Sequence, residues 1–139
     1  MPLVRKAIAL ATILLLPACV ADRAREADRP YTAGLAEVES VEIEVQRLAP
    51  ASAWARVRGH LPDPCTALES ADVRRSGSIF RVVLPTRRPF GALCEPMTTP
   101  FETRIRLDVD TDHSGAYVVT VNGVSQSFAV NLLHTGPLL

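Results

Sequence analysis

Apolar and polar side chains alternate along three segments of the chain, 41–46, 54–61 and 104–109. A period of two places one face of a β-strand against a core and the other face in water. The segment 80–84 is more continuously apolar, which is typical of a central strand. Because no apolar pattern of helical period extends over three turns, we predict that the chain is all-β.

Proline and glycine residues separate the alternating segments. Short antiparallel strands with a turn about every 8–12 residues indicate a sandwich of two sheets. We expect one β-sandwich domain at residues 38–131, roughly the size of an immunoglobulin-type sandwich. Its strands are expected near 39–48, 53–61, 67–74, 78–85, 102–110, 115–121 and 124–131.

Two turns allow strand registers to be proposed. Asn122-Gly123 between apolar residues is the strongest short hairpin signal and predicts a type I′ turn that pairs Tyr117 with Phe128. The first hairpin is expected to turn around Pro50, with Glu44 opposite Arg56. The same register places Glu42 opposite Arg58, so opposite charges across the strands explain both arginines structurally.

A resemblance to known folds appears in the last third of the chain. The segment 112–119 reads Asp-His-Ser-Gly-Ala-Tyr-Val-Val. It resembles the tyrosine-corner region of immunoglobulin-like domains, where an acid and a glycine precede a tyrosine in the penultimate strand. The resemblance implies an immunoglobulin-like antiparallel β-sandwich of about seven strands, and it implies no activity.

Several other segments resemble small, uncharacterised bacterial lipoprotein domains. They are 58–65 with its terminal Cys65, the later Cys94, 100–102, 107–109 and 115–124. The resemblance implies the fold and export from the cytoplasm.

The first residues have the features of an export signal. Arg5 and Lys6 precede Ala7–Leu16, an uncharged run of about ten residues. A membrane span needs roughly 20 apolar residues, so this run predicts a secretory signal peptide. The signal ends in Leu16-Pro17-Ala18-Cys19, which resembles the bacterial lipobox.

In lipobox proteins the peptide before the cysteine is removed and the cysteine is acylated on its thiol and its new amino terminus. The resemblance therefore implies a cleaved signal at residues 1–18 and a lipidated Cys19. Val20 rather than Asp after the cysteine implies export to the outer membrane, by the sorting rule of proteobacterial lipoproteins. The alternative is an ordinary signal peptide with a chance cysteine.

Two further segments lie outside the expected sandwich. Residues 19–37 are rich in charge and alanine and are expected to be a flexible tether. Residues 132–139 form a C-terminal tail to which no role is assigned.

Composition narrows the functional classes. The chain has 139 residues with 15 basic and 15 acidic side chains, so its formal net charge is zero. A balanced charge argues against nucleic acid as a partner. Aromatic residues make up only 5% of the chain, which leaves few side chains for stacking on bases or sugars.

The chain contains three cysteines. With Cys19 acylated, Cys65 and Cys94 remain, and an even pair in an exported chain is most simply a disulfide. The alternative is a redox pair, which normally has Cys-x-x-Cys spacing. No metal site is predicted, because His60, His113 and His134 lack ligand spacing. The carboxylates near Asp110 are expected to form a solvated turn rather than a calcium site.

No motif of nucleophilic, metal-dependent or phosphate-binding catalysis is present in the sequence, so we expect neither an enzyme nor a cofactor. The candidate binding residues are Arg87, Arg88 and Phe90, in an expected loop near Cys94, because arginine and aromatic residues are enriched at binding hot spots. The alternative is solvated arginines beside a phenylalanine that caps the core. Trp54 falls on the polar face of its strand.

The expected role is a binding or structural module in the cell envelope, with the membrane as a partner through the lipid and an envelope protein as a second candidate partner. The alternative function is an immunoglobulin-like inhibitor of an envelope or extracellular protease, whose proline-braced loops would be preorganised for insertion into a cleft.

Overall fold

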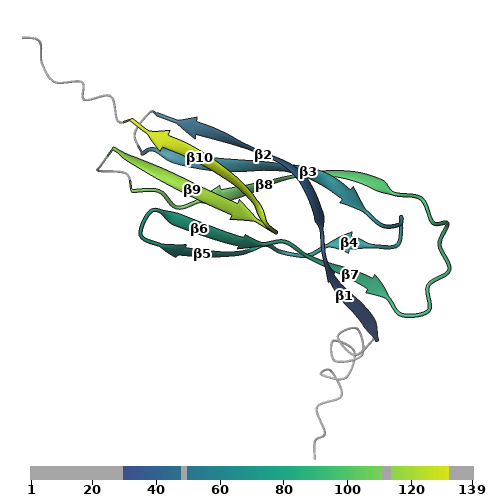
Figure 1. Ribbon diagram of the computed structural model, residues 1–139. Coiled ribbons are helices and arrows are strands. Elements are labelled where there is room, and N and C mark those ends of the chain that lie inside the picture. The colour runs from purple at the N-terminus through teal and green to yellow at the C-terminus, as the bar shows by residue number, and fades with distance from the viewer. Residues whose placement is uncertain (1–29, 48–49, 111–113, 132–139) are drawn as a thin grey trace, which may run out of the picture.

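The computed structural model describes residues 30–47, 50–110 and 114–131. Within these residues the chain forms ten strands in three hydrogen-bonded sheets (Figure 1). None of the described residues belongs to a helix that is long and apolar enough to cross a membrane. The strands are β1 (Tyr31–Leu35), β2 (Glu37–Gln46), β3 (Ser52–Leu61), β4 (Ala67–Leu68), β5 (Asp72–Ser76), β6 (Ile79–Val83), β7 (Pro85–Pro89), β8 (Thr99–Leu107), β9 (Gly115–Val121) and β10 (Val124–Val130).

Two of the sheets form the layers of the sandwich. Their strand orders are β2-β3-β8 and β10-β9-β6-β5, and the third sheet, β1-β7-β4, extends from one end of the molecule (Figure 1). Buried side chains of β3 and β8 pack in one core with those of β6 and β9. The prediction of an all-β sandwich is therefore confirmed.

The core is built by the alternation visible in the sequence. Burial alternates at every residue of β3, whose inward side chains include Ala53, Ala55 and Val57, all without exposed surface. Across the core, β6 and β9 contribute Phe80 and Val119. Period-two burial on facing strands lets the two layers interdigitate.

Aromatic side chains fill the core toward β10. The ring centroids of Phe80, Tyr117 and Phe128 lie 5.4–6.4 Å apart. The predicted pairing of Tyr117 with Phe128 is confirmed. The Tyr117 hydroxyl lies 3.3 Å from the Asp110 carboxylate, so the polar end of a buried tyrosine finds a partner at the core edge.

The chain passes between sheets at two buried single residues, and we call this region the strand crossing. Ala36 joins β1 to β2, Leu84 joins β6 to β7, and the Ala36 N–H donates to the Leu84 carbonyl at 3.1 Å. The side-chain nitrogen of Asn122 (Nδ2) donates to the backbone carbonyls of Ala36 (2.8 Å) and Leu84 (3.0 Å). The Leu84 N–H in turn donates to the Asn122 side-chain oxygen at 2.9 Å.

The Asn122-Gly123 turn matches the predicted type. Both residues have positive φ, 44° and 96°, as a type I′ turn requires. Asn122 thus serves the turn through its backbone and the strand crossing through its side chain.

The register predicted for the first hairpin is wrong by two residues. Glu42 faces Arg56 and Glu44 faces Trp54. A slip of two keeps every side chain on its predicted face, so alternation could not reveal it. The last pair of the hairpin is Gln46 with Ser52, so the two strands are centred one residue before Pro50.

Three further expectations need correction. The tether was expected to reach residue 37, but Tyr31–Leu35 pair with β7 as strand β1. The expected loop at 86–90 is largely strand β7, and β6 and β9 run parallel rather than antiparallel. Side-chain alternation carries no information on strand direction or on pairing between distant segments. Residues 1–29 and 132–139, with the expected signal peptide, Cys19 and the tail, lie outside the described residues.

Candidate functional site

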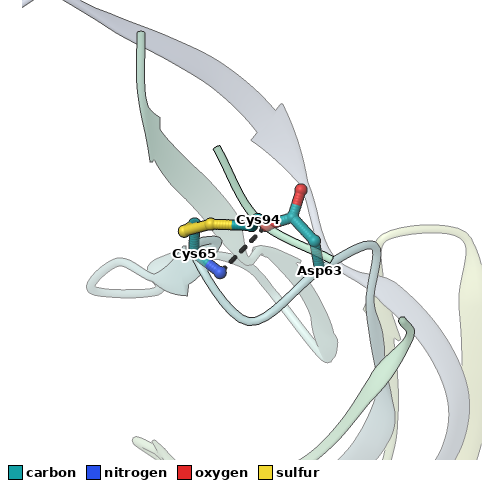
Figure 2. A group of neighbouring side chains, drawn as sticks. All are labelled: Asp63, Cys65 and Cys94. Carbon is teal, nitrogen blue, oxygen red and sulfur yellow. Dashed lines mark hydrogen bonds between the residues drawn. A yellow bond between two sulfur atoms is a disulfide. The ribbon is translucent and has the colours of Figure 1, made fainter. Parts of the chain in front are cut away.

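The loops after β3 and β7 meet at one end of the molecule, and we call them the disulfide loops (residues 62–66 and 90–98). They are joined by the predicted disulfide between Cys65 and Cys94, whose Cα atoms lie 6.2 Å apart (Figure 2). The bond links positions 29 residues apart. Two connections that would otherwise be independent are therefore held as one unit.

Asp63 organises the first of these loops. One carboxylate oxygen accepts hydrogen bonds from the backbone N–H groups of Cys65 (3.0 Å) and Thr66 (2.9 Å). It also accepts one from the Thr66 hydroxyl at 3.0 Å. An aspartate that binds backbone N–H groups two and three residues later is a common turn former.

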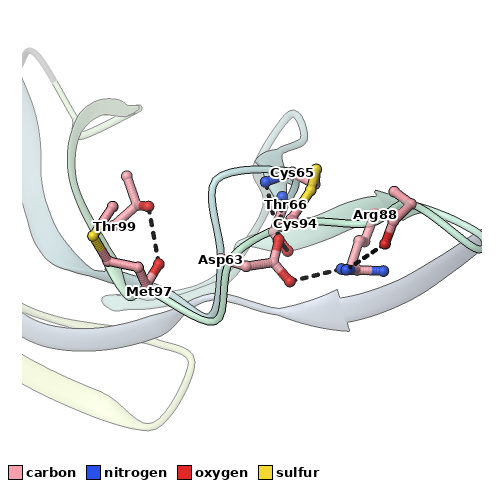
Figure 3. The surroundings of a disulfide bond; sticks show 8 residues. Asp63, Cys65, Thr66, Arg88, Cys94, Met97 and Thr99 are labelled. Carbon is pink, nitrogen blue, oxygen red and sulfur yellow. Dashed lines mark hydrogen bonds and ion pairs between the residues drawn. A yellow bond between two sulfur atoms is a disulfide. The ribbon is translucent and has the colours of Figure 1, made fainter.

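The second carboxylate oxygen of Asp63 receives Arg88 from β7. The Arg88 Nε donates to it at 2.7 Å, and an Arg88 terminal nitrogen donates to the Ala92 carbonyl at 3.0 Å (Figure 3). Only 13% of the Asp63 side chain is exposed. The hydrogen bond from Arg88 is the main cause that lowers the pKa of Asp63, and the Thr66 bond adds to it. Arg88 thus braces both disulfide loops.

The other candidate binding residues are arranged differently. The Arg87 guanidinium lies 4.9 Å from the centroid of the Tyr31 ring, which places it over β1. Phe90 follows β7 and is 74% exposed, so it does not cap the core. Farther along the loop, Leu93 is fully exposed and Met97 is 58% exposed. The three predicted residues therefore divide into a brace (Arg88), a stacked cation (Arg87) and a free apolar side chain (Phe90).

The outer face of sheet β2-β3-β8 carries a network of opposite charges. Arg58 donates to Glu102 at 2.7 Å and to Glu42 at 3.1 Å. Arg56 pairs with Glu44. The two predicted cross-strand ion pairs therefore form, diagonally rather than directly across the strands. The hydrogen bond with Arg58 lowers the pKa of Glu102.

Other polar groups considered in the sequence are also paired. The Trp54 ring lies on the outer face beneath the Arg104 guanidinium, 5.1 Å from its centroid. His60 lies 2.8 Å from Glu39. The Asp110 carboxylate binds Arg75 at 2.7 Å. Arg75 thus neutralises this carboxylate, and residues 111–113 of the expected turn lie outside the described residues.

The opposite outer face, on sheet β10-β9-β6-β5, is less charged. A shallow hollow of about 440 Å³ lies there, lined by Leu35, Arg81, Val83, Thr120 and Gly123, among others. Ile79 and Val118 of this face are also partly exposed. The lining offers one cation and little else that could orient a ligand.

Comparison with known proteins gives the chain a family. The profile described as the ORF11 beta-sandwich domain matches residues 55–130. The chain belongs to the ORF11 beta-sandwich domain family. Its relatives include two proteins of Herpetosiphon aurantiacus, the "Uncharacterized 10.2 kDa protein in HgiCIIM 5'region" and the "Uncharacterized 10.2 kDa protein in HgiBIM 5'region". The first is 31% identical over 90 residues, which is 65% of this chain and 95% of the relative. The second is 31% identical over 78 residues, 56% of this chain and 94% of the relative. No solved structure matches significantly.

The ORF11 beta-sandwich match includes both disulfide loops and the Asn122 turn, but it begins within β3, after β1 and all of β2. In this chain, Asp63 and the two cysteine sulfurs also lie within 4.8 Å of one another, as metal ligands can. The sulfurs are bonded to each other and the carboxylate is occupied by hydrogen bonds. In this state the cluster offers a metal no free thiolate.

Sequence reasoning missed two residues of this ORF11 beta-sandwich domain. Asp63 was signalled by Asp-x-x-Thr at a chain reversal, a pattern typical of aspartate-capped turns. Asn122 was identified only as a turn residue. Its contacts with Ala36 and Leu84 join positions 86 and 38 residues away, and no local pattern encodes them.

Proposed function

We propose that this protein is a lipid-anchored component of the bacterial cell envelope, attached to the outer membrane through Cys19. The Cys65–Cys94 disulfide is the observation that supports it, because such bonds persist mainly in oxidising compartments outside the cytoplasm. The disulfide uses two of the three cysteines. The third, Cys19, is the last residue of the lipobox-like segment Leu16-Pro17-Ala18-Cys19. An export signal and an oxidised domain point to the same compartment.

The anchor has a clear physical basis. A single acyl chain holds a protein to a bilayer only marginally, whereas two or more hold it stably. Acylation of both the thiol and the amino group of Cys19 supplies that number. The sandwich is then held close to the membrane surface.

We infer that the sandwich acts as a non-catalytic binding or structural module. Three of its arginines form ion pairs within the domain. Arg88 binds Asp63 between the disulfide loops, and Arg56 and Arg58 bind glutamates on their own sheet. This arrangement suits a rigid scaffold better than a reacting centre, in which titratable groups converge on a cleft.

The anchor is tested by Cys19→Ala in cells fed a labelled fatty acid. The proposal predicts that the variant loses the label and leaves the membrane fraction. The control is Cys65→Ala/Cys94→Ala, which should keep the label because Cys19 is intact. Labelling of Cys19→Ala, or its absence from the wild type, would contradict the anchor.

Inhibition of a protease is a second candidate function, and the full exposure of Leu93 beside the disulfide favours it. A side chain presented on a braced loop can enter a specificity pocket with little entropic cost. The full-length protein should then inhibit at least one member of a panel of extracellular proteases. Leu93→Gly should remove the inhibition, while Ile79→Gly on the outer face of β6 should not.

A further inference from the structure

We propose that the loop carrying Phe90, Leu93 and Met97 contacts the lipid surface when the protein is anchored. This inference rests on the proposed lipid anchor and specifies which end of the sandwich faces the bilayer. Its occupant is the interfacial region of a phospholipid membrane.

The first observation is that several apolar and aromatic side chains at this end of the domain are exposed to solvent. Leu93 is fully exposed, Phe90 is 74% exposed, Met97 58% and Tyr31 48%. Single exposed apolar residues are ordinary, but several at one end of a small domain indicate a contact surface. Phenylalanine and leucine favour burial at the acyl boundary, and tyrosine favours the headgroup level.

The second observation is the place where the chain leaves the described structure. The Phe90 N–H donates to the Pro30 carbonyl at 2.9 Å, and Tyr31 pairs with Pro89. The segment that leads to Cys19 therefore departs beside Phe90. Figure 1 shows this departure at the same end as the loop between β7 and β8, whereas β10 ends at the opposite end.

The length of the connecting segment limits the distance to the membrane. Cys19 lies eleven positions before Pro30, and a fully extended segment of that length reaches about 36–40 Å. The end of the sandwich that holds Phe90 is therefore tied within that distance of the bilayer, whereas the opposite end is tied to it only through the length of the sandwich. Other exposed apolar side chains, such as Ile79, lie on the outer face of the sheet and not at this attachment.

The braces of the disulfide loops suit this contact. Arg88 is held by Asp63 and by the Ala92 carbonyl, and Arg87 lies over Tyr31. These cations are paired or stacked rather than free. Glu95 is the only charged side chain within residues 90–98 and is exposed, so Phe90 and Leu93 can meet lipid while Glu95 stays in water. A protease-binding loop would explain Leu93 but not the exposed Tyr31 on a separate strand.

The experiment uses the protein as isolated from its own membranes, reconstituted with vesicles of phosphatidylethanolamine and phosphatidylglycerol. The chain has one tryptophan, Trp54, on the outer face of β3. Phe90→Trp adds a second one on the loop. The emission of the added tryptophan should be blue-shifted, and replacing part of the lipid with brominated lipid should quench it. The Trp54 emission of the parent protein should stay nearly unchanged.

A charge placed on the loop provides a matched test. In the Phe90→Trp protein, Leu93→Asp should reduce the bromolipid quenching because a carboxylate resists transfer into the interface. Ile79→Asp, the same kind of change on the sheet face, should not reduce it. Equal effects of the two substitutions would overturn the proposal.

Vesicle flotation distinguishes a failure of the loop contact from a failure of the lipid anchor. If the protein floats with the vesicles but the added tryptophan is not quenched, the anchor stands and the loop contact is rejected. If the protein does not float, the lipid anchor is rejected and the loop contact with it.

Discussion

The strand crossing and the disulfide loops are both places where the chain leaves regular strand pairing, yet they are held together differently. At the crossing, the neutral side-chain amide of the partly buried Asn122 binds backbone groups of the buried residues Ala36 and Leu84. At the loops, a covalent bond and the Asp63–Arg88 ion pair do the work at a partly exposed site. We therefore expect the crossing to be insensitive to redox state and acid, and the disulfide loops to respond to both.

The comparison gives each region a separate basis for stability. Hydrogen bonds between neutral groups change little with pH, so the crossing should persist wherever the sheets persist. The disulfide loops depend on an oxidising compartment and an ionised carboxylate. Substitutions can therefore disturb the two regions separately.

The largest effect is expected from removing the disulfide. Cys65→Ser/Cys94→Ser opens a loop with a sequence separation of 29, and the chain-entropy model gives a loss of about 3–4 kcal/mol in the free energy of unfolding. Urea denaturation measures it. Reductant should destabilise the wild type to a similar extent and leave the variant unchanged; an effect on the variant would show that the loss has another origin.

The next largest effect is expected at the crossing. Asn122→Gly tolerates the positive φ of the turn but removes the side-chain bonds to Ala36 and Leu84. Leaving buried backbone groups without partners should cost about 2–3 kcal/mol. Ser125→Ala, which removes an exposed hydroxyl from the same hairpin, is the matched control for denaturation. Similar costs for the two variants would contradict the role assigned to Asn122.

A somewhat smaller effect is expected at Gly59, beside the crossing. A Cβ at this position would lie 1.9 Å from the Glu37 carbonyl oxygen, so Gly59→Ala must displace β2 from β3. Overpacking of this kind costs about 2 kcal/mol. Gly77→Ala is the comparison, because a Cβ there meets nothing and only its positive φ opposes the change. Thermal unfolding should rank Gly59→Ala as the less stable variant.

The smallest effect is expected from protonating Asp63. Arg88 holds the folded-state pKa of Asp63 below its ordinary value. The stabilisation is therefore complete above the unfolded-state pKa, about 4, and is lost as the pH falls through the folded-state pKa. Asp63→Asn should flatten the loss of stability in that acid range.

The acid response also has a control. The wild type keeps part of its acid sensitivity through Glu102, whose pKa is lowered by Arg58, so the flattening is partial. In an Arg88→Gln background, Asp63→Asn should change the pH dependence less than it does in the wild type. An unchanged profile in Asp63→Asn itself would remove the ion pair from the account.

The sequence predicted the two layers of the sandwich but not how their strands are connected and paired. Alternation in β3 predicted its buried face, and Asn122-Gly123 predicted a hairpin with the observed register. Both signals are local and repeat along the chain. The β2–β3 register was missed because a slip of two preserves the faces, and the parallel β6–β9 pair was missed because direction leaves no mark on side-chain order.

At the candidate site, too, features signalled locally were predicted, whereas contacts between distant segments were not. The disulfide followed from counting cysteines, but the role of Arg88 did not, because its partners Asp63 and Ala92 meet it only through the pairing of distant segments. The exposure of Phe90 depends on β7 continuing to Pro89, which a segment with two prolines did not suggest. Contacts between distant segments therefore decide which arginine braces the fold and which side chain is left free.

Intact-mass spectrometry of the protein extracted from its own membranes would show whether Cys19 carries the lipid anchor. We expect a chain that starts at Cys19, carries acyl groups on that cysteine and retains an oxidised Cys65–Cys94 bond. A chain with an unmodified Cys19 thiol, or one that keeps residues 1–18, would contradict the lipid anchor.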